Sequence, residues 1–192
     1  MFDVVILAAG EAKRFGSPKQ LASWKGKPLI QDIVTKCRQN GLEPIVCLGA
    51  HYDEIIYHQD VDFQACTILR IQNWSIGLSA SIKESLVYIQ SSSKYGVLFL
   101  LADQPLFSSD DLRVLQNKIS MNFKNIVCMK YEGSVGVPAY FPKSYFGRLK
   151  SLSGDQGAKS ILISSHCELV ESTHPMIDID SPADITKALK MI

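Results

Sequence analysis

The sequence has no excess of charge of either sign. Its 192 residues include 20 lysines and arginines against 19 aspartates and glutamates, which gives a net charge of +1. A chain balanced in this way has no overall field that would draw it to nucleic acid or to an anionic membrane, so we expect neither as a partner. Any site for an anion must therefore be built locally, from a few basic residues.

Long apolar runs and paired cysteines are also missing. No stretch approaches the roughly 20 apolar residues of a membrane-spanning helix, and Asp3 lies where a signal peptide would carry cations. The five cysteines lie in or beside apolar segments without a CxxC pair, which favours reduced, buried thiols over disulfides. No two of the four histidines have the HxH spacing of a zinc site. We therefore expect a cytoplasmic protein.

What the sequence does contain is an alternation of short apolar segments with segments of helical period. The predicted strands are residues 4–9, 44–48, 66–71, 97–101, 126–129, 169–170 and 176–179, with 133–141 as a hairpin partner or an arm across the sheet. The predicted helices follow Pro28 and begin near 52, 78, 108, 145, 158 and 181. With no repeat, low-complexity tract or linker, residues 1–192 are expected to form one domain. The pattern predicts a three-layer α/β fold with a doubly wound, mostly parallel, Rossmann-like sheet.

Ligands in such folds bind outside the carboxyl ends of the strands. The residues that matter most should therefore follow Leu7, Ile71 and Leu101 or lie around Ile179. The first of these places is a turn, residues 8–10, followed by a loop with three cations and a second glycine. Backbone N–H groups and basic side chains at the end of a buried strand are suited to a nucleoside triphosphate.

The better-known phosphate loops do not fit this opening segment. It lacks the GxGxxG spacing of dinucleotide-binding folds and the GxxxxGK[ST] spacing of the P-loop. An oxidoreductase with a nicotinamide cofactor is therefore disfavoured. What is present is LAAG-x3-R-x-G-x-PK-x-L, from Leu7 to Leu21.

This segment resembles the signature of the MobA-like nucleotidyltransferases and, more specifically, of their molybdenum cofactor cytidylyltransferase branch. Five further segments resemble the same family in the same order: 73–82 (NWSIGLSASI), 100–105 (LLADQP), 136–141 (GVPAYF), 154–159 (GDQGAK) and 177–184 (IDIDSPAD). Any one of them would be a weak signal. Together they cover nearly the whole chain and are specific.

The resemblance implies a nucleotide site and a catalytic set. The implied nucleotide-binding residues are Leu7, Ala8, Ala9, Gly10, Arg14, Lys19, Asn73, Gly77, Ser79, Ser81 and Asp103. Among them, Arg14, Lys19 and Asp103 are the predicted catalytic residues, with the two cations offsetting charge on the triphosphate. Asp103 follows the most hydrophobic run of the chain, where a carboxylate can hold a metal ion. A simple turn before Pro105 is the alternative interpretation.

The implied cofactor is Mg²⁺ or Mn²⁺, held by Asp103 with help from Asp178 or Asp180. These last two aspartates lie two residues apart, and in a strand their side chains would point to the same face. Asp184 is expected instead to be the acid of a helix capping box. On the acceptor side the resemblance implies Gly136, Pro138, Gly154, Asp155, Gln156 and Gly157, with Asp155 expected to cap the helix that follows it.

The reaction implied is transfer of a nucleoside monophosphate, CMP from CTP, to the phosphate of molybdopterin with release of pyrophosphate. The paired alanines of the opening motif go with CTP in the family, whereas nothing else in the sequence reads the base. The implied partners are the nucleoside triphosphate, a molybdopterin-type acceptor, and a client molybdoenzyme or its chaperone. Two alternatives stay open: a nucleotidyltransferase for another phosphorylated acceptor such as a sugar phosphate, and a non-catalytic nucleotide-binding delivery protein.

Overall fold

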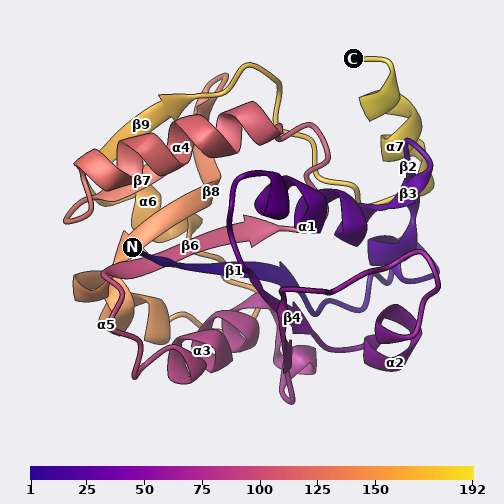
Figure 1. The fold of residues 1–192 in the computed structure, drawn as a ribbon, viewed down its shortest axis with the longest axis horizontal. Coiled ribbons are helices and arrows are strands. Elements are labelled where there is room, and N and C mark those ends of the chain that lie inside the picture. The colour runs from indigo at the N-terminus through magenta and orange to yellow at the C-terminus, as the bar shows by residue number, and fades with distance from the viewer.

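The computed structural model describes residues 1–192 and is built on one seven-stranded sheet (Figure 1). In sheet order the strands are β5 (Thr67–Arg70), β4 (Ile45–Leu48), β1 (Asp3–Ala8), β6 (Gly96–Leu101), β8 (Ser134–Pro142), β7 (Ile126–Tyr131) and β9 (Cys167–Glu171). Only β8 runs antiparallel to its neighbours, and it pairs with both β6 and β7. It is therefore both hairpin partner and arm across the sheet, and the mostly parallel sheet is confirmed.

Helices cover both faces of this sheet (Figure 1). They are α1 (Leu29–Gln39), α2 (Tyr52–Ile56), α3 (Leu78–Tyr88), α4 (Ser109–Met121), α5 (Phe146–Lys150), α6 (Lys159–Ile163) and α7 (Pro182–Leu189). Three short 3₁₀ turns, η1 (Lys19–Leu21), η2 (Trp74–Ile76) and η3 (Lys143–Tyr145), and a small hairpin of β2 (Ser23–Trp24) and β3 (Lys27–Pro28) complete the chain. None of the helices has the length and apolar character needed to span a membrane.

Alternate residues of the central strands supply two separate cores. Ile6 of β1 belongs to the core on the side of α1 and α4, which contribute Ile33 and Leu115. Its neighbour Val5 faces the other side, where α3 contributes Ile82. Because successive strand residues point to opposite faces, a strand buried on both sides must be apolar throughout. This explains the continuous hydrophobic runs and confirms the three-layer architecture.

Two helices begin at the capping boxes expected from the sequence. Ser108 accepts a hydrogen bond from the Asp111 N–H at 3.0 Å at the start of α4. At the start of α7, the Asp184 carboxylate accepts from the Ser181 N–H at 2.8 Å. The Ser181 hydroxyl also donates to this carboxylate at 2.7 Å, and the hydrogen bonds from the hydroxyl and the N–H of Ser181 lower the pKa of Asp184. Asp184 therefore stabilises a helix terminus.

The order of the strands opens a crevice between β1 and β6. The chain runs outward from β1 through β4 to β5 and then returns to β6 on the other side of β1. At such a change of direction the connections leave the two neighbouring strands on opposite faces, so the carboxyl ends of both strands remain uncovered. The residues after Ala8 and after Leu101 therefore meet in one place.

The predicted strand 176–179 is absent. Ile179 donates its N–H to the Asp103 carbonyl at 2.9 Å, but no ladder of bonds accompanies this contact and the segment belongs to no sheet. It connects β9, at one edge of the sheet, with α7 at the far side of the molecule (Figure 1). A connection that crosses the ends of the strands cannot pair along them, which explains the wrong prediction.

Candidate active site

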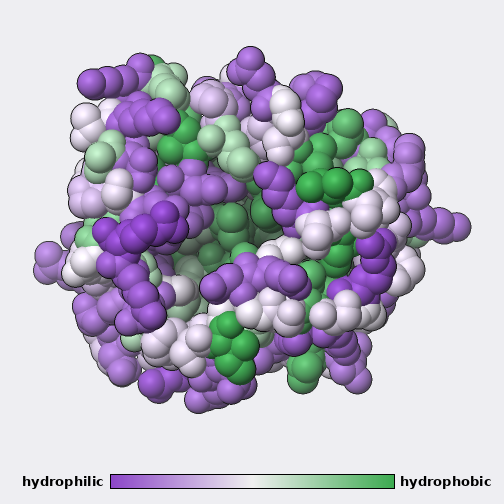
Figure 2. Space-filling view, turned by 180° about the vertical axis from the view of Figure 1, so that it is seen from behind, coloured by the Kyte–Doolittle hydropathy of each residue, from purple (hydrophilic) through white to green (hydrophobic).

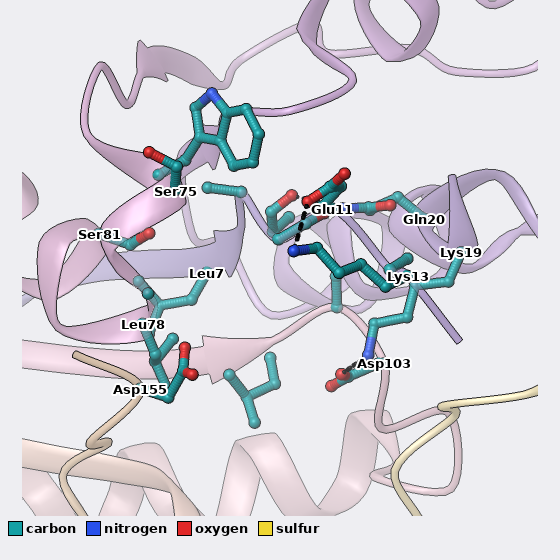
Figure 3. A pocket seen from close by; sticks show the side chains of 18 residues that line it. Leu7, Glu11, Lys13, Lys19, Gln20, Ser75, Leu78, Ser81, Asp103 and Asp155 are labelled. Carbon is teal, nitrogen blue, oxygen red and sulfur yellow. Dashed lines mark hydrogen bonds and ion pairs between the residues drawn. The ribbon is translucent and has the colours of Figure 1, made fainter. Parts of the chain in front are cut away.

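A cavity of about 480 Å³ lies at the crevice between β1 and β6 (Figure 3). Its walls come from the turn and loop after β1, from η2 and the start of α3, from the end of β6, and from Asp155. Leu7, Leu78 and Leu101 give it an apolar part, whereas Lys19 and Asp103 lie together on one side (Figure 3). The space-filling view from behind shows a hollow with a hydrophobic floor and hydrophilic residues around it (Figure 2). This combination suits a ligand with one apolar ring and one charged end.

The turn after β1 is held in shape by Gln20. Its side-chain nitrogen donates to the carbonyls of Ala8 at 2.7 Å and Gly10 at 3.0 Å, and the residue is buried. The backbone N–H groups of Gly10 and Glu11 have no acceptor within the protein. A turn whose carbonyls are occupied and whose N–H groups are free is suited to receiving an anion.

Lys19 joins this loop to two aspartates from distant parts of the chain. Its Nζ lies 2.6 Å from Asp103 Oδ2 and 3.2 Å from Asp180 Oδ1. The Lys19 and Asp103 side chains are 18% and 19% exposed, while Asp180 is 41% exposed. The other oxygen of Asp180 pairs with Arg14 at 3.2 Å. We call Asp103 and Asp180 the acid pair.

Burial and charge oppose each other at this contact. Burial raises the pKa of Asp103 because the ionised carboxylate loses water, and the nearby Lys19 only partly offsets this effect. Burial alone would lower the pKa of Lys19, but the carboxylates of Asp103 and Asp180 outweigh it, so the net pKa is raised. The ammonium is therefore firmly held by the acid pair.

The acid pair also fits a divalent cation. Asp103 Oδ1 is buried and has no hydrogen-bond partner, a costly arrangement that a bound cation would relieve. No group of three or more His, Cys, Asp or Glu side chains is arranged around a common metal position. Mg²⁺ is commonly held by one or two carboxylates, with phosphates and water completing its shell. Two carboxylates beside a turn with free N–H groups are compatible with that donor set.

Asp178 does not join the acid pair. It is exposed, and its Oδ1 accepts a hydrogen bond from the Gln104 side chain at 2.9 Å. Because residues 176–179 form no strand, the expectation that Asp178 and Asp180 share a strand face is wrong. The structure brings Asp180 to Lys19 and Asp103 and leaves Asp178 beside Gln104.

A glycine at the start of α3 allows the turn 154–157 to pack closely against this helix and to form one wall of the cavity. Gly77, at the start of α3, has φ +118°, and a Cβ on it would lie 2.4 Å from Asp155 Oδ1 and 2.6 Å from the Gly154 carbonyl carbon. The Ser79 N–H also donates to the Gly154 carbonyl at 3.1 Å. The turn 154–157 is therefore packed against the start of α3, and Asp155 lines the same cavity as the opening loop.

Asp155 does not cap the following helix, contrary to expectation. That helix, α6, begins at Lys159 after Ala158, without a capping side chain. The reason is that the turn holds the Asp155 carboxylate beside Gly77, away from the helix terminus. Gln156 is exposed and accepts from the Ser153 N–H, and Gly157 lies against Leu78.

Several predicted residues lie outside the cavity lining. Asn73 donates to the Glu84 carboxylate at 3.1 Å, and Arg14 points to Asp180 with 80% of its side chain exposed. Ser79 is buried beneath the wall, whereas Ser81 lines it. Gly136 and Pro138 lie on β8, where Gly136 approaches Met176 rather than the cavity.

Other lining residues are absent from the prediction. They are Glu11, Ala12, Lys13, Gln20, Trp74, Ser75, Leu78, Leu101 and Ala102. Most of them are next to a predicted residue in the sequence, so their position beside a motif could have identified them. Trp74 approaches because residue 49 is glycine: a Cβ there would lie 2.6 Å from both the Ala9 carbonyl and the Trp74 Cβ. Such a contact between remote segments leaves no trace in local sequence.

Comparison with solved structures shows the same fold elsewhere. The manganese complex of Rv0371C from Mycobacterium tuberculosis H37Rv superposes with a TM-score of 0.83 at 22% identity, covering 100% of this chain and 99% of that one. Molybdopterin-guanine dinucleotide biosynthesis protein A from Archaeoglobus fulgidus gives 0.71 at 15% identity, covering 99% and 97%. At these identities the likeness concerns the fold.

Sequence comparison finds similarity to proteins of different kinds. The purine catabolism protein PucB of Bacillus subtilis is 24% identical over 196 residues, covering 94% of this chain and 92% of PucB. The bifunctional protein GlmU of Cellvibrio japonicus is 31% identical over 121 residues, covering 60% of this chain but only 25% of GlmU. The model of the MobA-like NTP transferase domain matches residues 4–169. Together with the fold and the cleft, this match shows that the chain belongs to the MobA-like NTP transferase family.

Proposed function

We propose that this chain transfers CMP from CTP to the phosphate of a molybdopterin-type acceptor and releases pyrophosphate. One observation carries the proposal: the free N–H groups of the Gly10 turn, the ammonium of Lys19 and the carboxylate of Asp103 border one cleft. A triphosphate needs the first two groups, and a divalent cation needs the third.

The chemistry asks for positioning and charge more than for covalent work. An oxygen of the acceptor phosphate attacks the α-phosphorus of the nucleotide, a new P–O bond forms, and the bond to the bridging oxygen of pyrophosphate breaks. Because the acceptor oxygen is already anionic, no general base is required. The barrier lies in bringing two anions together and in stabilising charge on the leaving group.

Named residues can meet both requirements. Lys19 and Arg14 would offset charge on the phosphates, and the N–H groups of Gly10 and Glu11 would donate to phosphate or base oxygens. Asp103 and Asp180 would hold Mg²⁺ or Mn²⁺, which would neutralise phosphate charge when bound. A solved structure of the same fold is a manganese complex, which supports a divalent metal in general.

The base and the acceptor depend more heavily on resemblance. The paired Ala8 and Ala9 favour CTP, and the apolar part of the cavity would hold the base. A molybdopterin acceptor is supported by the likeness in fold to a molybdopterin-guanine dinucleotide biosynthesis protein. Since PucB, a purine catabolism protein, matches over nearly its full length, molybdoenzymes of purine breakdown are the clients to test first.

Gly136, Pro138 and the turn 154–157 remain proposed acceptor contacts, with one refinement. Asp155 borders the nucleotide cavity, and a carboxylate there would repel phosphate. We therefore propose that the Asp155 carboxylate accepts a hydrogen bond from the nucleotide or from the acceptor, at the far side of the cavity from Lys19.

Two other functions stay in competition. The partial match to the bifunctional protein GlmU supports a second candidate, a nucleotidyltransferase for another phosphorylated acceptor such as a sugar phosphate. A non-catalytic delivery protein would keep the cradle but would not need the acid pair. The presence of both aspartates at Lys19 argues for catalysis.

Pyrophosphate release tests these possibilities together. The purified protein is incubated with Mg²⁺ and each of CTP, GTP, UTP and ATP, with molybdopterin, with a sugar phosphate, or with no acceptor. We expect release with CTP and molybdopterin only, and none from Asp103→Asn. Release with the sugar phosphate would replace the acceptor, release with another nucleotide would replace the base, and nucleotide binding without release would favour the delivery protein.

A further inference from the structure

The groups proposed to hold phosphate and metal are paired with each other in the structure. Lys19 Nζ contacts both members of the acid pair, at 2.6 Å and 3.2 Å, and Arg14 contacts the second oxygen of Asp180. Two cations and two carboxylates therefore form a closed, neutral set. Each of the four must change partner before a metal ion and a triphosphate can both be held.

The ammonium of Lys19 lies between the two carboxylates of the acid pair, in contact with Asp103 Oδ2 and Asp180 Oδ1. A divalent cation that approached the same oxygens would face an ammonium within a few ångströms, in a place where the Lys19 and Asp103 side chains are each less than a fifth exposed. Like charges at such a distance repel strongly because burial weakens the screening by water. Of the four carboxylate oxygens of the acid pair, only Asp103 Oδ1 is left without a partner.

We propose that Lys19 acts as a built-in counter-ion that competes with the divalent metal for Asp103 and Asp180. The metal alone then binds weakly. A triphosphate offers Lys19 and Arg14 a new anionic partner, which frees the acid pair for the metal, so nucleotide and metal bind cooperatively. The competition follows from the geometry alone, whereas the cooperativity rests on the proposed function.

The position of the two cations in the chain favours a joint exchange. Arg14 lies in the loop between the Gly10 turn and η1, and Lys19 is the first residue of η1, whereas Asp103 and Asp180 belong to other segments. A small movement of one loop would therefore release both carboxylates. This loop also contains Gly16 with φ +78°, a conformation that glycine adopts without strain.

Binding of Mn²⁺ without nucleotide tests the competition directly. Free Mn²⁺ is quantified by electron paramagnetic resonance during titration of the wild type, Lys19→Met, Lys19→Arg and Lys27→Met. Lys27 is an exposed lysine of β3 without an ion pair, so its variant controls for the loss of one charge. We expect Lys19→Met to bind Mn²⁺ at least tenfold more tightly than the wild type, and both other variants to bind within threefold of it.

The gain should depend on the acid pair. In the double variant Lys19→Met/Asp103→Asn, Mn²⁺ affinity should return to the wild-type value or below. The proposal is overturned if Lys19→Met binds Mn²⁺ no more tightly than the wild type, or if the double variant keeps the gain.

Nuclear magnetic resonance on the wild type provides a test that needs no variant. The ¹⁵Nζ signal of Lys19 is followed while Mg²⁺ is added, and in a second titration while CTP is added in the presence of a chelator. We expect both additions to shift this signal, each with saturation, because each removes Lys19 from the acid pair. If the ¹⁵Nζ signal of Lys19 does not shift with Mg²⁺, the competition is overturned. If it does not shift with CTP, the cooperativity is overturned.

These results are separable from those on the reaction itself. The Mn²⁺ titrations contain no nucleotide, so the gain in affinity is expected even if no acceptor is ever modified. Conversely, pyrophosphate release without any gain in Lys19→Met would leave the proposed function standing and remove the counter-ion role.

Discussion

At the scale of single residues, Asp178 and Asp180 show how two identical side chains acquire different surroundings. Asp180 meets Lys19 and Arg14, while Asp178 accepts a hydrogen bond from Gln104. We expect Asp180→Asn to lower kcat by at least about tenfold, in line with losses at groups that support a metal. Asp178→Asn, which can still accept from Gln104, should stay within threefold of the wild type. Steady-state kinetics of both variants would decide, and the reverse ranking would contradict the assignment.

Asp103 should be indispensable for turnover but not for folding. Asp103→Asn keeps the shape of the side chain and leaves Lys19 paired with Asp180, so circular dichroism should show a native fold. We expect kcat to fall by at least about 100-fold, because the variant removes a proposed metal ligand. Near-normal turnover in a folded Asp103→Asn protein would remove the metal role.

Gly77 is the residue on which the wall of the cavity depends. Gly77→Ala forces a Cβ within 2.6 Å of the Gly154 backbone at φ +118°, so the turn 154–157 must shift. We expect a loss of about 1–3 kcal/mol in the free energy of unfolding and a several-fold rise in KM for the nucleotide. Denaturant unfolding and initial rates measure the two effects.

Gly133→Ala is the matched control for this change. Gly133 also has positive φ, +72°, but a Cβ there would meet nothing within 4 Å. It should show backbone strain in unfolding experiments with an unchanged KM. An equal rise in KM for both variants would mean that Gly77 acts through stability alone.

At the scale of elements, the regular parts of the fold could be predicted because their signals are local. The box of Ser108 and Asp111 marks the start of α4, and the apolar run before Asp103 marks the central strand β6. Segment 176–179 is also mostly apolar, yet it pairs with no strand. Whether a short apolar segment forms a strand depends on the neighbour that the rest of the chain provides, which local sequence does not contain.

Helix α2 is connected to the opening loop by a residue with a pH-dependent charge. His51 Nδ1 lies 2.9 Å from the Glu54 carboxylate and Nε2 lies 3.0 Å from the Glu11 carbonyl. Burial alone would lower the pKa of His51, but these two acceptors favour the protonated ring, and the net pKa is raised above 6.5. The folded state therefore holds this proton at pH values where the unfolded chain has released it.

This contact predicts a small decrease in stability with rising pH. The contribution of His51 should be complete below pH 6.5 and lost as the pH rises through the raised pKa. For a partly exposed pair we expect less than about 1 kcal/mol. Denaturant unfolding across this range, compared with His51→Gln, isolates the effect. Identical pH profiles for the two proteins would show that His51 does not contribute.

At the scale of the whole molecule, the reversal of strand order between β1 and β6 brings four distant segments to one cleft. The sequence was sufficient to predict the edge of the sheet at which Gly10, Lys19 and Asp103 would lie. It could not predict that Lys19 would pair with both Asp103 and Asp180, nor that Asp155 would line the same cavity. Those contacts depend on how loops pack across the sheet, and pairwise packing between remote loops has no periodicity to read.

The central claim is that the acid pair holds a metal ion while Lys19 and the Gly10 turn hold a triphosphate in the same cleft. A crystal structure with Mn²⁺ and a CTP analogue that cannot be cleaved between the α- and β-phosphates tests it most directly. We predict an anomalous manganese peak at Asp103 and Asp180, with the phosphates on Lys19 and the Gly10 turn. A triphosphate bound outside this cleft, or manganese bound without Asp103, would contradict the account.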